Sequence, residues 1–332
     1  MTQKYDVFGV GNAIVDILAQ VPDEAITELG LNKGGMTLME PDQQASVLKF
    51  LEDKSLSLAS GGSAANTMAA IAQSGGTGFY AGKVAHDPHG EFYHKDMKET
   101  GIECYIPPAP EKGLPTGTSV ILTTPDAERT MCTHLGISAT LTPEDIDPHR
   151  LAECQYCYVE GYLWTGETTR AASILAFELA KKHGVKTAFT FSDLFLVDLF
   201  KNDFRSLTEE HCDTVFCNAD EARQLFDLED PRQCAEELGK LCSLGFVTDG
   251  PNGCFVSDAG QIEHVEGFQA EAVDTVGAGD AFAGGTLYGL THGMTATDAA
   301  RWGNYFASRV VQQFGPRIDE PMQNQLESII QN

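Results

Sequence analysis

Short apolar runs alternate with helical stretches through most of this 332-residue chain, and this alternation restricts the fold more than any other feature. Residues 172–184 (ASILAFELAKKHG) have helical periodicity and end at a glycine, and the apolar run 185–191 (VKTAFTF) follows at once. The run 213–218, the helical stretch 221–226 and the run 244–249 repeat the pattern. Such β-α-β-α alternation predicts an α/β fold with a mostly parallel sheet covered by helices.

Two regions interrupt the alternation. Residues 18–58 and 104–134 lack the regular pattern, and the second region is rich in Pro, Gly and Thr and contains the strand-like segment TSVILTT. We expect a part of 18–58, together with 104–134, to form a small β-sheet lid. The α/β core would then consist of residues 1–17, 59–103 and 135–332.

The strongly acidic composition narrows the choice of partners. The formal net charge is −26, whereas a nucleic-acid-binding surface must be basic, so we expect no nucleic-acid partner. A phosphate site in such a chain would have to be built locally from backbone amides, a metal ion and an arginine.

No apolar stretch approaches the ~20 residues of a membrane-spanning helix, and the first ten residues do not have the layout of a signal peptide. We therefore expect a cytoplasmic protein with no membrane partner.

The nine cysteines are scattered along the chain. Cys154 and Cys157 have CxxC spacing, but a zinc site needs a second pair of ligands at a suitable distance, and the sequence offers none. An odd number of cysteines fits a reducing compartment. We interpret them as buried structural thiols rather than as metal or redox groups.

Common phosphate-binding motifs are absent. Gly9 and Gly11 end a predicted strand at 5–11, but Ile14 stands where the dinucleotide-binding fingerprint needs a third glycine or alanine. The nearest approach to a P-loop, at 30–35, is followed by a methionine instead of lysine, and the HRD and DFG motifs of protein kinases are missing. These absences disfavour a nicotinamide oxidoreductase and a P-loop enzyme.

Residues 274–285, DTVGAGDAFAGG, form a different kind of phosphate site. Glycines allow close approach of the backbone and let consecutive N–H groups point into one concavity, and a helix at 281–293 would add its positive end. Gly277, Ala278, Gly279 and the amide of Asp280 would form an anion hole. The Asp280 carboxylate would deprotonate a hydroxyl as it attacks a phosphoryl group. Taken alone, the same pattern also fits a tight turn capped by an aspartate.

A second glycine-rich loop, residues 60–66, leads into an apolar helix much earlier in the chain. With both loops in place, the chain resembles the PfkB (ribokinase-like) family of carbohydrate and nucleoside kinases. Residues 61–76 (GGSAANTMAAIAQSGG) match the first signature of that family and 274–285 the second. The resemblance extends over essentially the whole chain. It implies a three-layer α/β/α core with a β lid, and phosphoryl transfer from ATP to a primary hydroxyl.

For the nucleotide side, the resemblance implies that Asn218 and Glu221 are the NxxE motif that holds Mg²⁺ through waters. The same two residues also fit a helix N-cap with an acidic first turn. Thr248 and Gly250 resemble the stretch that lines the phosphates and ribose of ATP. Asn304 resembles the polar residue beside the adenine, although an amide on a helix surface is an equal interpretation.

For the acceptor side, Asp16 in the segment GNAIVD would accept hydrogen bonds from two adjacent sugar hydroxyls, a task that suits the two oxygens of a carboxylate. Taken alone, it would also fit a cap at a strand end. The resemblance assigns the rest of the acceptor to five further residues: Asn12, Gly61, Gly62, Asn66 and Glu160.

Arg129 is the cation that the resemblance places over the transferring phosphoryl group, because the family has an arginine at the end of a lid hairpin. A guanidinium matches the geometry of phosphate oxygens. The alternative is a surface salt bridge between Arg129 and Glu128 or Asp126.

The preferred acceptor is adenosine, giving AMP, because GNAIVDI, the arginine segment and the length of the lid are most similar to the bacterial adenosine-kinase-like branch. Alternatives are a ribose, fructose or ketodeoxygluconate kinase and a non-catalytic ligand-binding relative, although the base and the NxxE pair are both present here. The K⁺ dependence of some members, near Asp274, and the choice between monomer and homodimer stay open. Candidates to contact the base, each equally suited to ordinary packing, are Met36, Leu38, Trp164 and Phe191.

Overall fold

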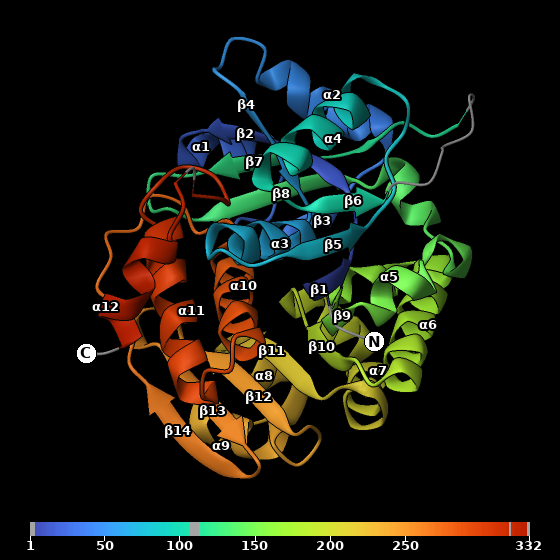
Figure 1. Cartoon of the computed structure of the whole chain (residues 1–332). Coiled ribbons are helices and arrows are strands. Elements are labelled where there is room, and N and C mark those ends of the chain that lie inside the picture. The colour runs from blue at the N-terminus through green and yellow to red at the C-terminus, as the bar shows by residue number, and fades with distance from the viewer. Residues whose placement is uncertain (1–3, 106–112, 319, 331–332) are drawn as a thin grey trace.

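A sheet of nine strands runs through the middle of the molecule (Figure 1). Its strands are β1 (Tyr5–Val10), β5 (Gly78–Ala81), β6 (Glu103–Tyr105), β9 (Cys154–Glu160), β10 (Lys186–Thr190), β11 (Thr214–Asn218), β12 (Leu244–Thr248), β13 (Cys254–Asp258) and β14 (Gln261–Val265). The order is β14-β13-β12-β11-β10-β9-β1-β5-β6 in this computed structural model, which describes residues 4–105, 113–318 and 320–330. All pairs are parallel except those that join β12, β13 and β14, so the expected mostly parallel sheet is confirmed.

Helices cover both faces of this sheet and complete the three expected layers (Figure 1). One face carries α5 (Pro148–Ala152), α6 (Glu167–His183), α7 (Leu194–His211), α8 (Ala219–Phe226) and α9 (Pro231–Leu238). The other carries α3 (Ser63–Gln73), α4 (Pro88–Thr100), α10 (Ala278–Thr291) and α11 (Ala296–Val310). Helix α6 begins at Glu167, before the predicted residue 172, and in its first turn the buried Thr169 donates its hydroxyl to the carbonyls of Leu163 and Gly166. Among the described residues, no helix has the length and apolar character needed to cross a membrane.

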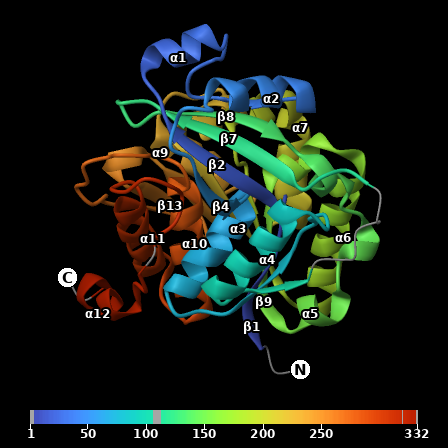
Figure 2. The same ribbon diagram turned by 90° about the horizontal axis from the view of Figure 1, so that it is seen from above.

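A second, five-stranded sheet lies over one end of the large sheet (Figures 1 and 2). Its order is β3-β8-β7-β2-β4, and its strands are β2 (Ile14–Gln20), β3 (Met36–Leu38), β4 (Ser57–Gly61), β7 (Gly117–Thr123) and β8 (Arg129–His134). Helices α1 (Asp23–Glu28) and α2 (Pro41–Phe50) cover its outer face through Ile17, Val120 and Leu122. Because side chains alternate along a strand, Asp16, Ser119 and Ile121 point to the other face, towards the core.

The edges of this second sheet differ from the expected lid limits. Strand β2 starts at Ile14 and β4 extends to Gly61, so residues assigned to the core belong to the small sheet. Conversely, β6 begins at Glu103 and pairs with β5 in the large sheet, so residues 104–105 do not belong to the lid sheet. The first difference arises because only residues 11–13 separate β1 from β2 and only Gly62 separates β4 from α3. The division into a core and a lid stays an interpretation.

Helices α3 and α10 pack closely, and their N-termini meet beneath the small sheet (Figure 1). Small residues allow this approach: a Cβ atom on Gly284 would lie 2.5 Å from the Thr67 carbonyl oxygen and 2.6 Å from the Ala70 Cβ. The glycine-rich sequence that follows Asp280 therefore brings the starts of the two helices together.

The turn into α3 depends on one glycine. Gly62 has φ of 96°, a left-handed conformation that favours glycine, and a Cβ there would collide with the carbonyl oxygen of Asn12. At this turn, the start of α3 therefore packs closely against the loop between β1 and β2.

Replacing Gly62 with alanine is expected to lower the free energy of unfolding by more than about 2 kcal/mol, because strain at positive φ adds to the steric clash. The matched control is Gly101→Ala. Gly101 also has positive φ, 87°, but a Cβ there would meet nothing within 4 Å, so a loss of about 1 kcal/mol is expected. Urea unfolding measures both, and equal losses would contradict the proposed clash.

Candidate active site

A cavity of about 610 Å³ lies between the small sheet and the carboxyl ends of the strands of the large sheet. Ligand sites in open α/β sheets occupy this position. Polar residues at or just after the ends of five strands line the cavity: Asn12, Glu160, Thr190, Asn218 and Thr248. The cavity wall includes every residue predicted for catalysis, for the acceptor sugar, for ATP or for Mg²⁺, except Gly61.

Gly61 lies directly behind the carboxyl group of Asp16. A Cβ on Gly61 would collide with the Asp16 carboxyl carbon, so glycine leaves room for this side chain. Asp16 is 4% exposed, and within the described residues its carboxyl group has neither a hydrogen bond nor an ion pair. Buried carboxylates normally accept hydrogen bonds, so an unpartnered one at the wall of a cavity is available to accept them from a ligand.

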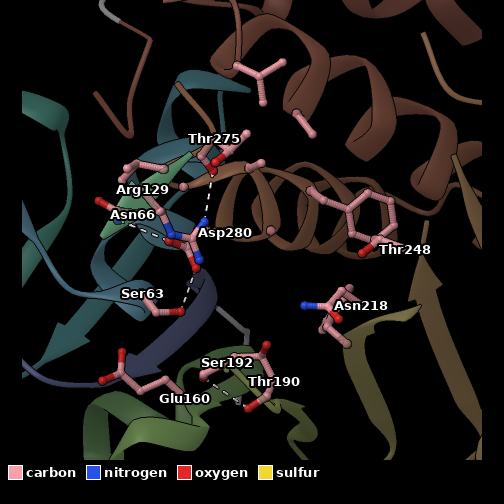
Figure 3. Close-up of a pocket in the computed structure, with 18 of the residues that line it drawn as sticks. Ser63, Asn66, Arg129, Glu160, Thr190, Ser192, Asn218, Thr248, Thr275 and Asp280 are labelled. Atoms are coloured by element: carbon pink, nitrogen blue, oxygen red, sulfur yellow. Dashed lines mark hydrogen bonds between the residues drawn. The ribbon is translucent and has the colours of Figure 1, made fainter. Parts of the chain in front are cut away.

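Two side chains from α3 converge on Asp280 (Figure 3). The Ser63 hydroxyl donates to Oδ1 of Asp280 over 2.6 Å, and the Asn66 amide donates to Oδ2 over 3.1 Å. The packing of α3 on α10 creates this arrangement. Ser63 was not among the predicted site residues, although a hydroxyl directly after Gly61-Gly62 at the start of a helix was a signal for it.

Glu160 is fully buried and holds other parts of the site in place. Its Oε1 accepts hydrogen bonds from the backbone N–H of Asn12, at 2.8 Å, and from the Asn12 side-chain amide, at 2.9 Å. Its Oε2 accepts from the N–H of Ala64, in the first turn of α3, at 2.8 Å. Both oxygens are thus engaged with the protein, which makes Glu160 a support for Asn12. A direct contact between Glu160 and an acceptor stays a prediction.

Gly277 and the first turn of α10, which we call the anion concavity, line the cavity where an anion is expected to bind. Gly277 is the N-cap residue, with φ of 75°, and the N–H of Ala278 donates to the Thr275 carbonyl over 3.3 Å. The N–H groups of Gly279 and Asp280 have no hydrogen-bond acceptor within the described residues, as is usual for the first turn of a helix. These two amides are therefore available to a phosphate.

The predicted metal-binding pair also caps a helix. The Asn218 side chain accepts a hydrogen bond from the N–H of Glu221, and the Glu221 carboxylate accepts one from the N–H of Asn218, each at 2.9 Å. Glu221 is 3% exposed, lines the cavity and forms no ion pair with a described residue. The capping interpretation is correct. The Glu221 carboxyl group is nevertheless buried without a positively charged partner among the described residues, at the position where the resemblance places Mg²⁺.

Asn304 is buried, so the interpretation as a helix-surface amide is wrong. Its side chain donates to the carbonyls of Val265 and Glu266, at 3.1 and 3.2 Å, and it also lines the cavity. The neighbouring Phe268 contributes an aromatic wall to the same region.

Arg129 does not form the surface salt bridge that was the alternative interpretation. Its guanidinium donates to the Thr275 carbonyl over 3.1 Å, just before the anion concavity (Figure 3). Asp126 pairs instead with Lys33, at 2.5 Å, and the Glu128 carboxylate accepts the backbone N–H of Arg129 rather than its guanidinium. The arginine thus reaches from the lid hairpin into the cavity.

Of the residues considered for contact with a base, only Met36 lines the cavity. Trp164 and Phe191 are buried in the core below the sheet, and Leu38 is 46% exposed on the edge of the small sheet. The structure places Ile121 and Met131 on the cavity wall instead. The signal for Ile121 was the alternation within TSVILTT, which sends Ile121 inward and its neighbours outward, and Met131 lies opposite Ile121 on β8.

The cavity has an excess of buried acid. Burial raises the pKa of Asp16 and Glu160 to about 7 and that of Glu221 to about 8. Burial also raises the pKa of Asp274 and Asp280, while hydrogen bonds from Ser63 and Asn66 act in the opposite direction on Asp280. The guanidinium groups of Arg129 and Arg317 partly offset this charge.

The buried carboxyl group of Glu160 should make stability depend on pH. Its pKa in the folded state, about 7, exceeds its ordinary value of 4.5, so the folded chain retains a proton that the unfolded chain releases. The contribution of Glu160 to the free energy of unfolding should therefore fall as pH rises from about 4.5 to about 7. Glu160→Gln removes this titration.

Urea unfolding from pH 4.5 to 7.5 tests this expectation. The free energy of unfolding of the wild type minus that of Glu160→Gln should decrease over that interval. For Glu178→Gln, an exposed glutamate on α6, the same difference should stay nearly constant. A difference for Glu160→Gln that is flat or increases with pH would contradict the raised pKa.

Comparison with known proteins agrees with this geometry. The family model described as pfkB family carbohydrate kinase matches residues 39–323. The crystal structure of an adenosine kinase from Sinorhizobium meliloti superimposes with a TM-score of 0.93 at 37% identity, covering 98% of this chain and 99% of that one. A probable sugar kinase from Rhizobium etli CFN 42 superimposes with a TM-score of 0.93 at 34% identity and 99% coverage of both chains.

A curated relative has a different name. The 5-dehydro-2-deoxygluconokinase of Bacillus subtilis (strain 168) is 26% identical over 82% of this chain and 86% of its own length. All three proteins are named as kinases, but the names give different acceptors. The resemblance noted from the two glycine-rich loops is confirmed: the chain belongs to the pfkB family of carbohydrate kinases and is an ATP-dependent phosphotransferase for a nucleoside or a sugar.

Proposed function

We propose that this kinase transfers the γ-phosphoryl group of ATP to the primary hydroxyl of adenosine, giving AMP. The observation that carries the choice of a nucleoside is the apolar inner face of the small sheet. Ser119 pairs with Asp16 across β7 and β2, and Ile121 follows Ser119 on the same face, beside Met131. A purine ring would cover this apolar surface, whereas a free sugar has no group that would do so. The likeness to the Sinorhizobium meliloti adenosine kinase supports the same choice.

Asp16 would bind the ribose. Its two carboxylate oxygens have no partner in the described residues and can accept hydrogen bonds from two adjacent hydroxyls. Asn12, held by Glu160, and Asn66 would contact the remaining polar atoms of the sugar. Because such donors favour the ionised form of Asp16, acceptor binding would lower its raised pKa.

Asp280 would act as the general base. Its carboxylate lies at the N-terminus of α10, next to the free amides that would hold the phosphoryl group. Hydrogen bonds from Ser63 and Asn66 orient it and favour its ionised form. It would take the hydroxyl proton as the acceptor oxygen attacks the phosphorus, and ADP would leave.

The phosphate side would use backbone amides and one arginine. The N–H groups of Gly279 and Asp280 would donate to phosphoryl oxygens, and Arg129 would turn from the Thr275 carbonyl towards the same group. Glu221, with Asn218, would hold Mg²⁺, which supplies positive charge to the phosphates. Thr248, Gly250 and Asn304 would contact the nucleotide. A K⁺ ion near Asp274 stays a prediction.

The proposal is tested by measuring ADP release with adenosine, inosine, ribose and fructose as acceptors. Adenosine should give the highest kcat/KM. Turnover of the free sugars alone would show that the nucleoside proposal is wrong and that the alternative sugar kinase is correct.

Met131→Gln should separate the two kinds of acceptor further. It keeps the length of the side chain but puts an amide on the apolar wall, so KM for adenosine should rise about 10-fold. KM for ATP should stay unchanged, because Met131 belongs to the lid sheet. An unchanged KM for adenosine would contradict contact between the base and this wall.

Asp280→Asn should lower kcat by a factor of about 10² to 10⁴, because the amide can still accept a hydrogen bond from Ser63 but cannot take the proton. KM should change little. Asp258→Asn, at the exposed end of β13, is the control and should keep normal turnover. Near-normal turnover of Asp280→Asn would rule out its role as the base.

A further inference from the structure

Three consecutive residues that follow α11 contact the parts of the site that lie far apart in the sequence. The N–H of Gly315 donates to Oδ2 of Asp274 over 3.0 Å. Pro316 packs against Gly277, where a Cβ would lie 2.7 Å from the Pro316 carbonyl oxygen. Arg317 then extends towards α3. The segment thus connects the anion concavity to the acceptor loop.

The Arg317 side chain is 10% exposed and has a partner on each of three elements. Its Nε donates to Oδ1 of Asn66 over 3.0 Å. Its Nη1 donates to the Ser60 hydroxyl over 2.6 Å and to Oδ2 of Asp96, on α4, over 3.2 Å. Asp96 also accepts the backbone N–H and the hydroxyl of Ser60, which completes the network.

The direction of these hydrogen bonds fixes the Asn66 amide. A guanidinium has donors and no acceptor, so the atom of Asn66 that faces Arg317 must be the oxygen. The amide nitrogen is then turned to Oδ2 of Asp280, 3.1 Å away. Without Arg317, the amide could turn over and place its oxygen against the Asp280 carboxylate, where two acceptors would repel each other.

We propose that Arg317 is a positioning residue for phosphoryl transfer, which holds the Asn66 amide in the one orientation that donates to Asp280. Arg317 acts through Asn66 and does not itself contact the reacting atoms. The proposal rests on the proposed role of Asp280 as the base, and nothing in the glycine-rich signatures includes this arginine.

The positive charge of Arg317 also acts directly on the Asp280 carboxyl group. Together with Arg129, it opposes the burial that raises the pKa of Asp280, and it does the same for Asp16. Loss of the charge should therefore raise the pKa of the base. The other groups that interact electrostatically with Asp280 come from β2 and from β9 and the turn after it: Asp16, Tyr158, Glu160 and Tyr162.

A double-mutant cycle separates positioning from a general structural effect. The variants are Arg317→Lys, which keeps the charge but loses the planar fork, Asn66→Ala, and the double variant. Arg317→Lys alone should lower kcat/KM about 10-fold. In the Asn66→Ala background, the same substitution should change kcat/KM less than about 2-fold, because the amide that it orients is gone. Equal factors in both backgrounds, or wild-type activity of Arg317→Lys, would overturn the proposal.

The matched control is Arg170→Lys. Arg170 also donates to a carbonyl, that of Trp164, and pairs with Asp203, but it lies outside the cavity wall, so its kcat/KM should stay at the wild-type value. All variants are assayed with whichever acceptor the wild type phosphorylates fastest. A failure of the adenosine proposal therefore appears as a different preferred acceptor and leaves the cycle interpretable.

The pH dependence of kcat/KM provides a second test, because a residue with a purely structural role would not change the apparent pKa of the base. In Arg317→Gln, the acidic limb of kcat/KM should shift to higher pH, because Asp280 loses both a nearby positive charge and the hydrogen bond from Asn66. Arg317→Lys keeps the charge and loses only the hydrogen bond, so its limb should shift in the same direction by a smaller amount. If the arginine variants unfold, Asn66→Asp repeats the test: it still offers Arg317 an acceptor but cannot donate to Asp280. It should lose at least as much kcat/KM as Asn66→Ala, and near-normal activity of Asn66→Asp would overturn the proposal.

Discussion

The close packing of α3 against α10 is the constraint on which the site depends. Gly284 leaves no room for a side chain between the helices, so the two backbones approach directly. One N-terminus supplies the free amides and Asp280, and the other supplies Ser63 and Asn66. The base and the two groups that orient it therefore come from rigid helices rather than from loops. A change in the distance between α3 and α10 would therefore alter the position of Asp280 relative to both Ser63 and Asn66.

Much of the fold and part of the site followed from local sequence. The alternation of strands and helices predicted the parallel sheet, and the two glycine-rich loops predicted the neighbourhood of Asp280. These features carry a local signal, since a glycine before a helix has conformational consequences wherever it occurs. Arg317 gave no such signal. It is 251 residues away from Asn66 in the sequence, and only tertiary packing brings the two together.

The misplaced residues of the acceptor pocket have a related cause. Phe191 and Trp164 are large and apolar, but Phe191, directly after β10, and Trp164, in the short helical turn after β9, are both buried in the core. Ile121 is less conspicuous in the sequence, yet the alternation along β7 directs it into the cavity. Residue type alone does not show whether an apolar side chain lies in the core or on the cavity wall. That depends on which face of its sheet the side chain occupies. The expected lid limits differ from those of the small sheet because the connections from β1 to β2 and from β4 to α3 are too short to mark a boundary in the sequence.

Hydrogen bonds at Thr275 connect the lid to the anion concavity. The turn of the β7–β8 hairpin contains Ala127, with φ of 64°, and its carbonyl accepts hydrogen bonds from the N–H and the hydroxyl of Thr275. Arg129, on the same hairpin, donates back to the Thr275 carbonyl. Thr275 precedes the first turn of α10 by only a few residues, so a movement of the hairpin would pull directly on the segment that leads to the free amides. In an acidic cavity with few cations, this connection makes the position of Arg129 and the shape of the phosphate site depend on each other.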